Sequence, residues 1–480
     1  MVIGHIYRHA ALTPDKVALV HNGTPWSYAA FAQAIECARR DLLPLRLRAG
    51  GYAVLAMHNL VDAWIYGIAL RSVGLTTVPL PASRDLADLR LDAVEGVFAS
   101  TRLADADFAA QAAPRGWRHF IRTESVPVIG QEVPLHTPAA PQGSHIMMTS
   151  GTTGDYKMLL HGAEADASVH ELNARMGGTP AIEVTFAGDF PLLTAGGWRW
   201  PQYTWAAGGT VVFHQGQNAL RTLLGSGITR AFATPATLAR LLADPQQDLQ
   251  RDDGIRLMVT GGPLPKVLWE QAQARITRQV YSWLAASEVA TFCLTRIETA
   301  EDLRSHRIHP AREVQVVDEA HRPLPAGVTG VVRIRQLSGL SAYLNDPETS
   351  RQFFHDGYFY PGDLGVISAD GRLTLQGRVT DVINALGTKI ATGPIEQTLA
   401  DRHGVEGVCV FAAPNAAGED EVHIVLQSTR TLDQAQLKST AQELLSMFRG
   451  VHFHQMAQLP RNHMGKIRRQ ELRRQILEKK

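Results

Sequence analysis

The residues best suited to chemistry form one short stretch, Thr149–Lys157, which combines hydroxyl side chains, two glycines and a lysine. Glycines let a loop turn tightly and bring backbone N–H groups close to an anion, while hydroxyls and a lysine add donors and positive charge. The stretch therefore predicts a phosphate-binding loop. It lacks the G-x-x-x-x-G-K-[ST] pattern of a loop that opens a helix, and the apolar runs on either side, His145–Met148 and Met158–Leu160, are typical of strands. A plain Gly/Thr hairpin turn is the alternative.

Two further groups of residues stand where strands are expected to end. Gly261–Gly262 follows the apolar run Ile255–Val259, and Ser287–Glu288 follows a second run that begins at Val280. Ligands in open parallel sheets bind outside the carboxyl ends of the strands, so we expect both groups to line a binding site. Glu288 suits Mg²⁺ there, because this hard cation prefers oxygen and is held by few carboxylates.

The elements that must position these residues alternate between strand and helix in the first part of the chain. Strand-like Val17–Val20 and Tyr52–Met57 are separated by a helical segment that Ser27 is suited to cap. One face of that helix carries apolar side chains, namely Phe31, Ile35, Ala38 and Leu42. Continued alternation of this kind predicts helices layered on a mainly parallel sheet.

The pattern changes near Ile308, where short strand-like segments joined by turns predict a smaller antiparallel sheet. Asp370–Gly371 is a strong hairpin signal within it. A compact α+β unit follows Arg378. The fold class is therefore α/β: a large N-terminal domain (residues 1–378) of mixed, mostly parallel sheets layered with helices plus a small antiparallel β subdomain, and then a small α+β C-terminal domain (379–480).

Composition narrows the class of protein. The chain has 480 residues, of which 45% are hydrophobic and 19% charged, so it is globular and long enough for two or more domains. A formal net charge of +1 argues against nucleic-acid binding. The cysteines (Cys37, Cys293 and Cys409) are far apart and suit a reducing compartment. With no signal-like N-terminus and no run of about 18 apolar residues, we expect a cytoplasmic protein without a membrane span.

Ordered stretches along nearly the whole chain resemble the motifs of the ANL superfamily of adenylate-forming enzymes. This superfamily contains acyl- and aryl-CoA synthetases, adenylation domains of peptide synthetases and luciferases. The stretches are the phosphate loop Thr149–Lys157, the adenine segment Gly261–Leu264, the aromatic–Gly–x–Thr–Glu counterpart Leu284–Glu288, the ribose tract Tyr358–Asp363, the hinge Gly377–Asp381, the tract Gly387–Glu396 and the lysine motif Leu459–Ile467.

The resemblance implies that a carboxylate attacks the α-phosphate of ATP, and that a thiol then takes the acyl group from the adenylate after the mobile C-terminal domain rotates about the hinge. The first step needs no general base, because a carboxylic acid is already ionised at pH 7. It needs positioning and positive charge instead.

The resemblance also implies roles for individual residues. Lys466 and Glu288 are the catalytic residues, with Lys466 bridging the carboxylate and the α-phosphate and Glu288 holding Mg²⁺. The nucleotide would be bound by Thr149, Ser150, Gly151, Thr152, Thr153, Gly154, Lys157, Gly261, Gly262, Pro263, Ser287, Asp363 and Arg378, with Asp363 and Arg378 at the ribose and Gly387 beside the pantetheine arm of the thiol.

Substrate and acceptor are less closely defined. The tryptophan-rich run Ala195–Trp200 with Trp205 favours a fatty or aryl acid, and tryptophans in a core are the alternative. The thiol would come from CoA or a separate carrier protein. A stand-alone amino-acid adenylation enzyme, a non-catalytic nucleotide-binding relative and luciferase-like oxidation are the other readings.

This sequence departs from the superfamily pattern at several positions. They are Tyr156, Met158, Leu284, Ala285 and Thr380, and they predict a specialised member.

Overall fold

The computed structural model describes residues 2–80, 86, 89–100, 107–122, 134–136, 138, 142–150, 156–225, 227–245, 248–385, 388–415, 420–448, 450–461 and 467–478. These residues form two compact units. Unit 1 comprises Met1–Phe232, Ala286–Ala290 and Gln336–Arg351, and unit 2 comprises Ala233–Ala285, Thr291–Arg335 and Gln352–Lys480. The domain boundary expected between residues 378 and 379 stays a prediction.

Unit 1 contains a largely parallel sheet that ends in an antiparallel hairpin. Its strand order is β6-β5-β3-β4-β7-β8, and every pair in it is parallel except β7 with β8. The strands are β3 Tyr52–Ala56, β4 Thr76–Pro79, β5 Val94–Ser100, β6 His119–Arg122, β7 His145–Ser150 and β8 Tyr156–His161. The strands expected on either side of the glycine-rich stretch are therefore confirmed, and they pair with each other as a hairpin. The connecting residues 151–155 lie outside the described part of the chain.

A second set of strands in unit 1 runs in the order β11-β9-β10-β1-β2, and only the pair of β1 with β2 is antiparallel. These strands are β1 Val17–His21, β2 Thr24–Ser27, β9 Val184–Gly188, β10 Thr210–Phe213 and β11 Arg230–Ala233. Strands alternate with helices along the chain here, which confirms the predicted parallel α/β architecture of this part.

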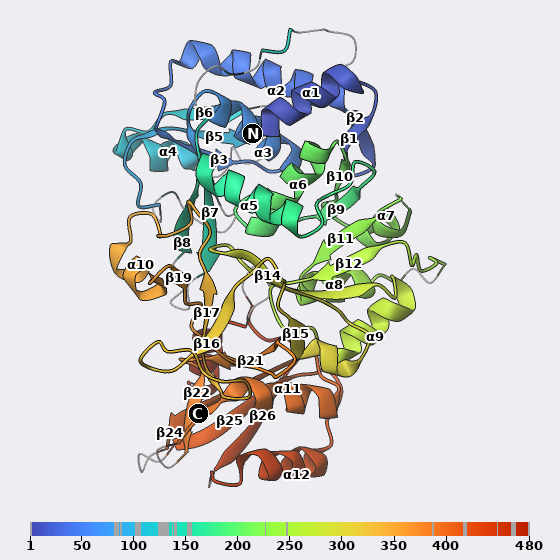
Figure 1. Cartoon of the computed structure of the whole chain (residues 1–480), viewed down its shortest axis with the longest axis vertical. Coiled ribbons are helices and arrows are strands. Elements are labelled where there is room, and N and C mark those ends of the chain that lie inside the picture. The colour runs from blue at the N-terminus through green and yellow to red at the C-terminus, as the bar shows by residue number, and fades with distance from the viewer. Residues whose placement is uncertain are drawn as a thin grey trace. The chain divides into compact units, whose positions relative to one another are not determined.

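The helices of unit 1 are α1 Val2–Leu12, α2 Tyr28–Leu42, α3 Leu60–Ser72, α4 Phe108–Ala112, α5 Ala163–Arg175, α6 Ala195–Ala207 and α7 Ala219–Gly225, with short 3₁₀ helices at Leu43–Leu45 and Ala113–Arg115. Ser27 caps α2 as predicted, because its hydroxyl accepts a hydrogen bond from the Ala30 N–H at 3.1 Å. The expected apolar face of α2 is buried. Helix α1, which no sequence signal had predicted, packs beside α2 (Figure 1).

Unit 2 begins with strands β12 Arg256–Val259, β13 Val280–Ala286 and β14 Ala290–Arg296 and helices α8 Pro235–Leu242 and α9 Lys266–Arg275. The first two of these strands are parallel. The antiparallel sheet expected after Ile308 follows, made of β15 Ser305–Arg307, β16 Val314–Val317, β17 Gly330–Arg335, β18 Phe354–His355, β19 Tyr358–Phe359, β20 Asp363–Ile367 and β21 Arg372–Arg378. Asp370–Gly371 forms the β20–β21 turn, where Gly371 has a φ of +79°. Ala300–Leu303 is a 3₁₀ helix, and α10 spans Pro347–Phe353.

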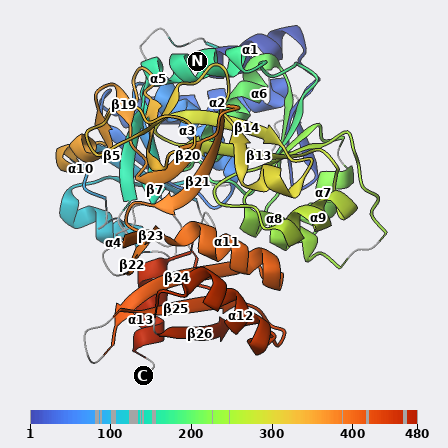
Figure 2. The ribbon, with the colours of Figure 1, turned by 60° about the horizontal axis from the view of Figure 1, so that its bottom comes forward.

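The C-terminal part of unit 2 is the α+β unit that the sequence predicts. It comprises β22 Val382–Ala385, β23 Thr388–Ala391, α11 Thr392–His403, β24 Gly407–Pro414, β25 Asp420–Gln427, α12 Gln434–Leu445, β26 Val451–Met456 and α13 Arg469–Leu477. Side chains alternate along β24, so Val408 and Val410 pack with α11 and α12, whereas Cys409 and Phe411 pack with α13. The three helices, labelled beside β24, β25 and β26 in Figure 2, thus cover both faces of this sheet.

A search of the described residues finds no helix with the length and apolar character that crossing a membrane requires.

Candidate active site

The β7–β8 hairpin positions the lysine of the glycine-rich stretch. Thr149 and Lys157 are directly opposite each other across the two strands. The ammonium of Lys157 lies 5.0 Å from the centroid of the Tyr343 ring, a cation–π contact. Gly151, Thr152, Thr153, Gly154 and the side chain of Ser150 lie outside the described part of the chain.

Tyr156 and Met158, which depart from the superfamily pattern, flank Lys157 on the opposite face of β8. Both pack against a hydrophobic cluster that includes Ile146 and Met148 of the paired strand. Because alternate residues of a strand point to opposite faces, these two side chains enter the core while Lys157 faces away from it. The unusual residues therefore anchor the hairpin.

Tyr343 joins Lys157 to Glu288. Its hydroxyl donates a 2.8 Å hydrogen bond to Oε1 of Glu288, and both side chains are buried, at 4% and 6% exposure. The Tyr343 N–H donates to the Ser350 hydroxyl at 2.9 Å, and the next residue, Leu344, donates its N–H to the Met158 carbonyl at 2.7 Å. These backbone contacts fix the tyrosine beside the hairpin. One aromatic side chain thus bridges the cation and the carboxylate that the sequence assigned to phosphate and metal.

Glu288 lies in the turn between β13 and β14. Its Oε1 is engaged by Tyr343, and no described side chain hydrogen-bonds its Oε2. Among the described residues there is no cluster of three or more histidine, cysteine or acidic side chains able to hold a metal. A site with one protein carboxylate fits Mg²⁺, which keeps waters and uses substrate phosphates as its other ligands, better than Zn²⁺.

Arg199 of α6 reaches the same turn. It is 5% exposed and donates through Nη2 to the Ser287 carbonyl at 2.7 Å, next to Glu288. Burial lowers the pKa of the guanidinium, while electrostatic interactions with Tyr203, Glu288 and Asp166 act in the opposite direction. Arg199 lies within the tryptophan-rich run Ala195–Trp200 but was not predicted as a site residue. Its signal in the sequence is a charged side chain within an otherwise apolar helical run.

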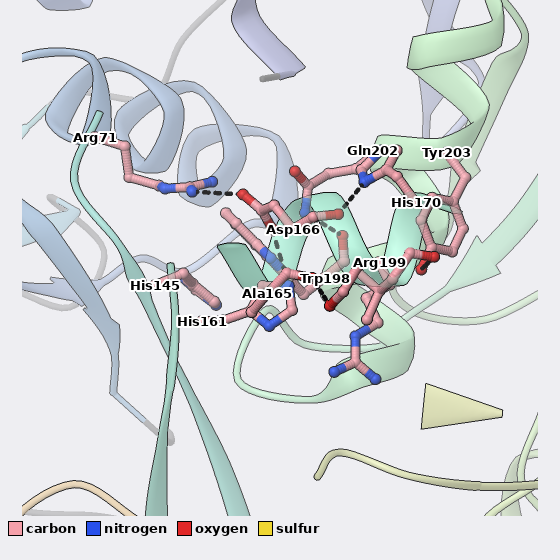
Figure 3. Close-up of polar contacts among 12 residues, drawn as sticks. Arg71, His145, His161, Ala165, Asp166, His170, Trp198, Arg199, Gln202 and Tyr203 are labelled. Carbon is pink, nitrogen blue, oxygen red and sulfur yellow. Dashed lines mark hydrogen bonds and ion pairs between the residues drawn. The ribbon is translucent and has the colours of Figure 1, made fainter. Parts of the chain in front are cut away.

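A buried polar network lies beside this site (Figure 3). Asp166 Oδ2 accepts from Arg71 Nη2 at 2.9 Å, and Oδ1 lies 2.9 Å from His161 Nε2 at the end of β8. Burial alone would raise the pKa of Asp166, but His161 and Arg71 outweigh it and hold that pKa well below its usual range. Burial lowers the pKa of His161 to about 4, so its imidazole is neutral at pH 7. The network connects α3, β8 and α5.

The sequence left open whether the tryptophans of α6 line an acid pocket or lie in the core. Trp198 and Trp205 are fully buried, and both pack on Trp64, one stacked and one edge-on with ring centroids 4.9 Å apart. The His145 ring stacks on Trp198 at 3.6 Å. Trp200 is half-buried and stacks on Phe232. For Trp198 and Trp205 the core interpretation is therefore correct, and they do not line an acid pocket.

The remaining nucleotide-binding candidates belong to unit 2. Asp363 and Arg378 are paired across β20 and β21 and form an ion pair of 2.9 Å. Gly261, Gly262 and Pro263 follow β12, with Gly261 at a φ of +89°.

Other residues around the expected nucleotide site are placed only in part. The indole N–H of Trp283 donates to the Thr291 hydroxyl at 2.6 Å within the core. The Thr380 hydroxyl donates to Asp381 at 3.3 Å. Gly387 and Lys466 lie outside the described residues. The structure thus brings together Thr149, Lys157, Ser287 and Glu288 in one unit, and Asp363 with Arg378 in the other.

Comparison with known proteins identifies relatives over most of the chain. Residues 6–344 match the family model described as AMP-binding enzyme. The chain is 26% identical to the indoleacetate–CoA ligase of Aromatoleum aromaticum, over 99% of this chain and 98% of the relative. It is 27% identical to the fatty acid–[acyl-carrier-protein] ligase ScoC of Streptomyces coeruleorubidus, over 68% and 66%.

Solved structures show the same fold. The amide bond synthetase McbA from Marinactinospora thermotolerans has a TM-score of 0.82 at 21% identity, with 98% of this chain and 99% of that chain covered. The O-succinylbenzoate coenzyme A synthetase MenE from Bacillus subtilis, in complex with ATP and magnesium ion, has a TM-score of 0.79 at 19% identity, with 98% and 99% covered.

Proposed function

The chain belongs to the AMP-binding enzyme family of the adenylate-forming ANL superfamily, and on this premise we propose that it activates a carboxylic acid with ATP and passes the acyl group to a thiol. A carboxylate oxygen attacks the α-phosphorus, the bond to the bridging oxygen breaks, and pyrophosphate leaves. The thiolate then attacks the carbonyl carbon of the mixed anhydride, and AMP leaves. Both steps need positioned charge more than proton transfer.

The observation that carries this proposal is the contact of Tyr343 with both Lys157 and Glu288. Lys157 supplies positive charge where the β- and γ-phosphates would lie, and Glu288 supplies a single oxygen ligand for Mg²⁺. When bound, Mg²⁺ would neutralise phosphate charge. Tyr343 thus links, through one side chain, the cation and the carboxylate proposed to serve the phosphates and the metal.

The other roles rest on the order of motifs. The Asp363–Arg378 pair would orient the ribose, with the Asp363 carboxylate accepting from its hydroxyls. Gly261, Gly262, Pro263 and Ser287 would contact the adenine side. Lys466 would bridge the carboxylate and the α-phosphate, and Gly387 would admit the pantetheine arm.

The acceptor is CoA or the phosphopantetheine of a carrier protein, since the relatives include a CoA ligase and an acyl-carrier-protein ligase. A fatty or aryl acid stays a prediction, with less support than the sequence indicated, because Trp198 and Trp205 lie in the core.

ATP–pyrophosphate exchange over a panel of fatty, aryl, dicarboxylic and amino acids tests the proposal. We expect exchange with at least one acid, and a loss of about 100-fold or more in Lys466→Ala, since removing one group that stabilises developing charge has that effect. Lys438→Ala, at an exposed lysine of α12, is the matched control and should retain exchange.

The same variant separates the two half-reactions. Lys466→Ala should still form thioester from a supplied acyl-adenylate, because Lys466 acts in the first step. ATP binding without exchange on any acid would instead show a non-catalytic relative and overturn the proposal. Exchange with amino acids only would identify an amino-acid-activating enzyme.

A further inference from the structure

Arg199 is buried, and no acidic side chain in the described part of the chain forms an ion pair with it. It lies on α6 between Trp198 and Trp200, and 5% of its surface is exposed. In Figure 3 its guanidinium points away from Asp166, the carboxylate of the adjacent polar network. Its Nη2 donates to the Ser287 carbonyl, and its Nε has no hydrogen-bond partner.

The other buried arginines of the described part of unit 1 differ from Arg199 in this respect. Arg71 pairs with Asp166 at 2.9 Å, and Arg230 pairs with Glu183 at 2.8 Å. Among the described acidic side chains, none forms an ion pair with Arg199. Among the described residues, the Ser287 carbonyl is therefore the hydrogen-bond acceptor for the Arg199 guanidinium, which has five N–H donors and a full positive charge.

This arrangement is costly unless an anion completes it. Burial lowers the pKa of Arg199, but a guanidinium starts so far above neutrality that it stays charged at pH 7. A buried charge without a counter-ion is strongly destabilising. The planar N–H fork of arginine matches a carboxylate, which can accept two parallel hydrogen bonds from it.

Glu288 is one carboxylate whose charge acts on the Arg199 guanidinium, as that of Asp166 does. However, Glu288 accepts from Tyr343 and, in the proposed reaction, holds Mg²⁺. The reacting carboxylate of the acid would meet Lys466. Once ATP, metal and acid are bound, Glu288 is paired with Mg²⁺ and the reacting carboxylate is paired with Lys466. Arg199 then has no counter-ion from either of these groups.

We infer that Arg199 binds a second carboxylate of the acid substrate, so that the enzyme activates dicarboxylic acids, one carboxylate reacting and the other held on the guanidinium. The inference rests on the proposed function for the reaction itself. It excludes long fatty acids as the preferred substrate, because an unpaired cation would then face a hydrocarbon chain.

Matched acids test the inference in ATP–pyrophosphate exchange: butyrate with succinate, hexanoate with adipate, and benzoate with terephthalate. We expect the wild-type kcat/KM to favour the dicarboxylic acid in at least one pair. Arg199→Met should lose about 100-fold on that acid, the effect of truncating one partner of a buried charge pair, and keep or gain activity on the monocarboxylic acid. Arg199→Lys should retain part of the preference.

A control and a binding measurement separate folding, binding and catalysis. Arg312→Met removes another buried arginine that donates to a carbonyl, that of Arg335 at 2.8 Å, and should keep the preference. Without ATP, the preferred dicarboxylic acid should raise the melting temperature of the wild type and of Arg312→Met, but not of Arg199→Met.

The outcomes distinguish the inference from the proposed function. Two outcomes overturn the inference and leave the proposed function standing. In the first, wild type and Arg199→Met exchange with the same preference between the two acids of a pair. In the second, Arg199→Met loses activity equally on both acids. Equal loss would place Arg199 at the reacting carboxylate. Stabilisation by dicarboxylic acid that depends on Arg199, without exchange on any acid, supports the inference and overturns the function.

Discussion

At the scale of residues, Tyr343 is the side chain on which the arrangement of the site depends. It lies 55 residues from Glu288 and far from Lys157 along the chain, yet it contacts both. A phenylalanine would keep the ring under the lysine and remove only the hydroxyl donor. The two contacts of Tyr343 can therefore be tested separately.

We predict that Tyr343→Phe raises the KM for MgATP several-fold and lowers stability by about 1–3 kcal/mol, because it leaves a buried carboxylate oxygen without its donor. Tyr7→Phe is the matched control. Tyr7 donates to Glu36 at the same 2.8 Å, also buried, between α1 and α2. Steady-state exchange and urea unfolding measure both variants. The role given to Tyr343 is wrong if the two variants lose stability alike and neither changes the KM for MgATP.

A site residue could be predicted from the sequence only where its signal lies in the residues next to it. Lys157 and Glu288 stand in local stretches whose composition is itself unusual, so both could be named. Tyr343 and Arg199 make contacts that depend on how distant segments pack, and Tyr343 resembles an ordinary core residue in its local sequence. Tyr156 and Met158 were recognised as unusual, but their packing against Ile146 and Met148 required the strand pairing.

At the scale of elements, α13 is held to the C-terminal part of unit 2 by one arginine. Arg469 contacts both carboxylate oxygens of Glu396 on α11, at 2.7 and 2.6 Å, and its Nε lies 2.9 Å from Asp381. Leu472 and Ile476 add an apolar contact with β24 and β25. Helix α13 is thus exposed to solvent on one side only.

We predict that Arg469→Met lowers the free energy of unfolding by about 2 kcal/mol, less than for a fully buried pair because the side chain is 30% exposed. Arg468→Met is the control one residue away, where the guanidinium pairs with Glu471 and is 58% exposed. Exposed pairs contribute little, so it should leave the unfolding midpoint almost unchanged. Urea unfolding followed by circular dichroism compares them, and equal losses would contradict the role of Arg469.

Elements with strong periodicity were predicted well. Helix α2, the β7–β8 hairpin and the Asp370–Gly371 turn follow from patterns contained within a few residues. The order of the strands in the sheets could not be predicted from such local patterns. In unit 1 the chain places β9 between β11 and β10, an order that depends on crossover connections and on which apolar faces meet. Helix α1 was not predicted, although its buried residues include Ile3 and Ile6.

At the scale of the whole molecule, buried histidines make the fold sensitive to acid. Burial lowers the pKa of His5, His161 and His306 to about 4, and it also holds the pKa of His145 well below its usual range. In the unfolded chain these groups titrate near about 6.5. Between these values the unfolded state binds more protons than the folded state, so stability falls as pH falls from 6.5 towards 4.

We predict that the urea midpoint of the wild type drops steadily over this interval, with His161 accounting for up to about 3 kcal/mol of the loss. His161→Gln keeps an N–H donor for Asp166 but cannot titrate, so its midpoint should depend less steeply on pH. Unfolding curves at pH 7.5, 6.0 and 5.0 measure the slope. Parallel slopes for the two proteins would show that His161 is not responsible.

Unit 1 is built from three separate segments of the chain, which affects the order in which its parts become available during translation. Lys157 belongs to its first segment, but Glu288 comes with Ala286–Ala290 and Tyr343 with Gln336–Arg351. During translation, a nascent chain that has emerged as far as Phe232 carries the lysine without the tyrosine or the carboxylate. The ribosome must deliver more than a hundred further residues before the three can meet. Nucleotide therefore cannot meet all three side chains together during the first steps of folding.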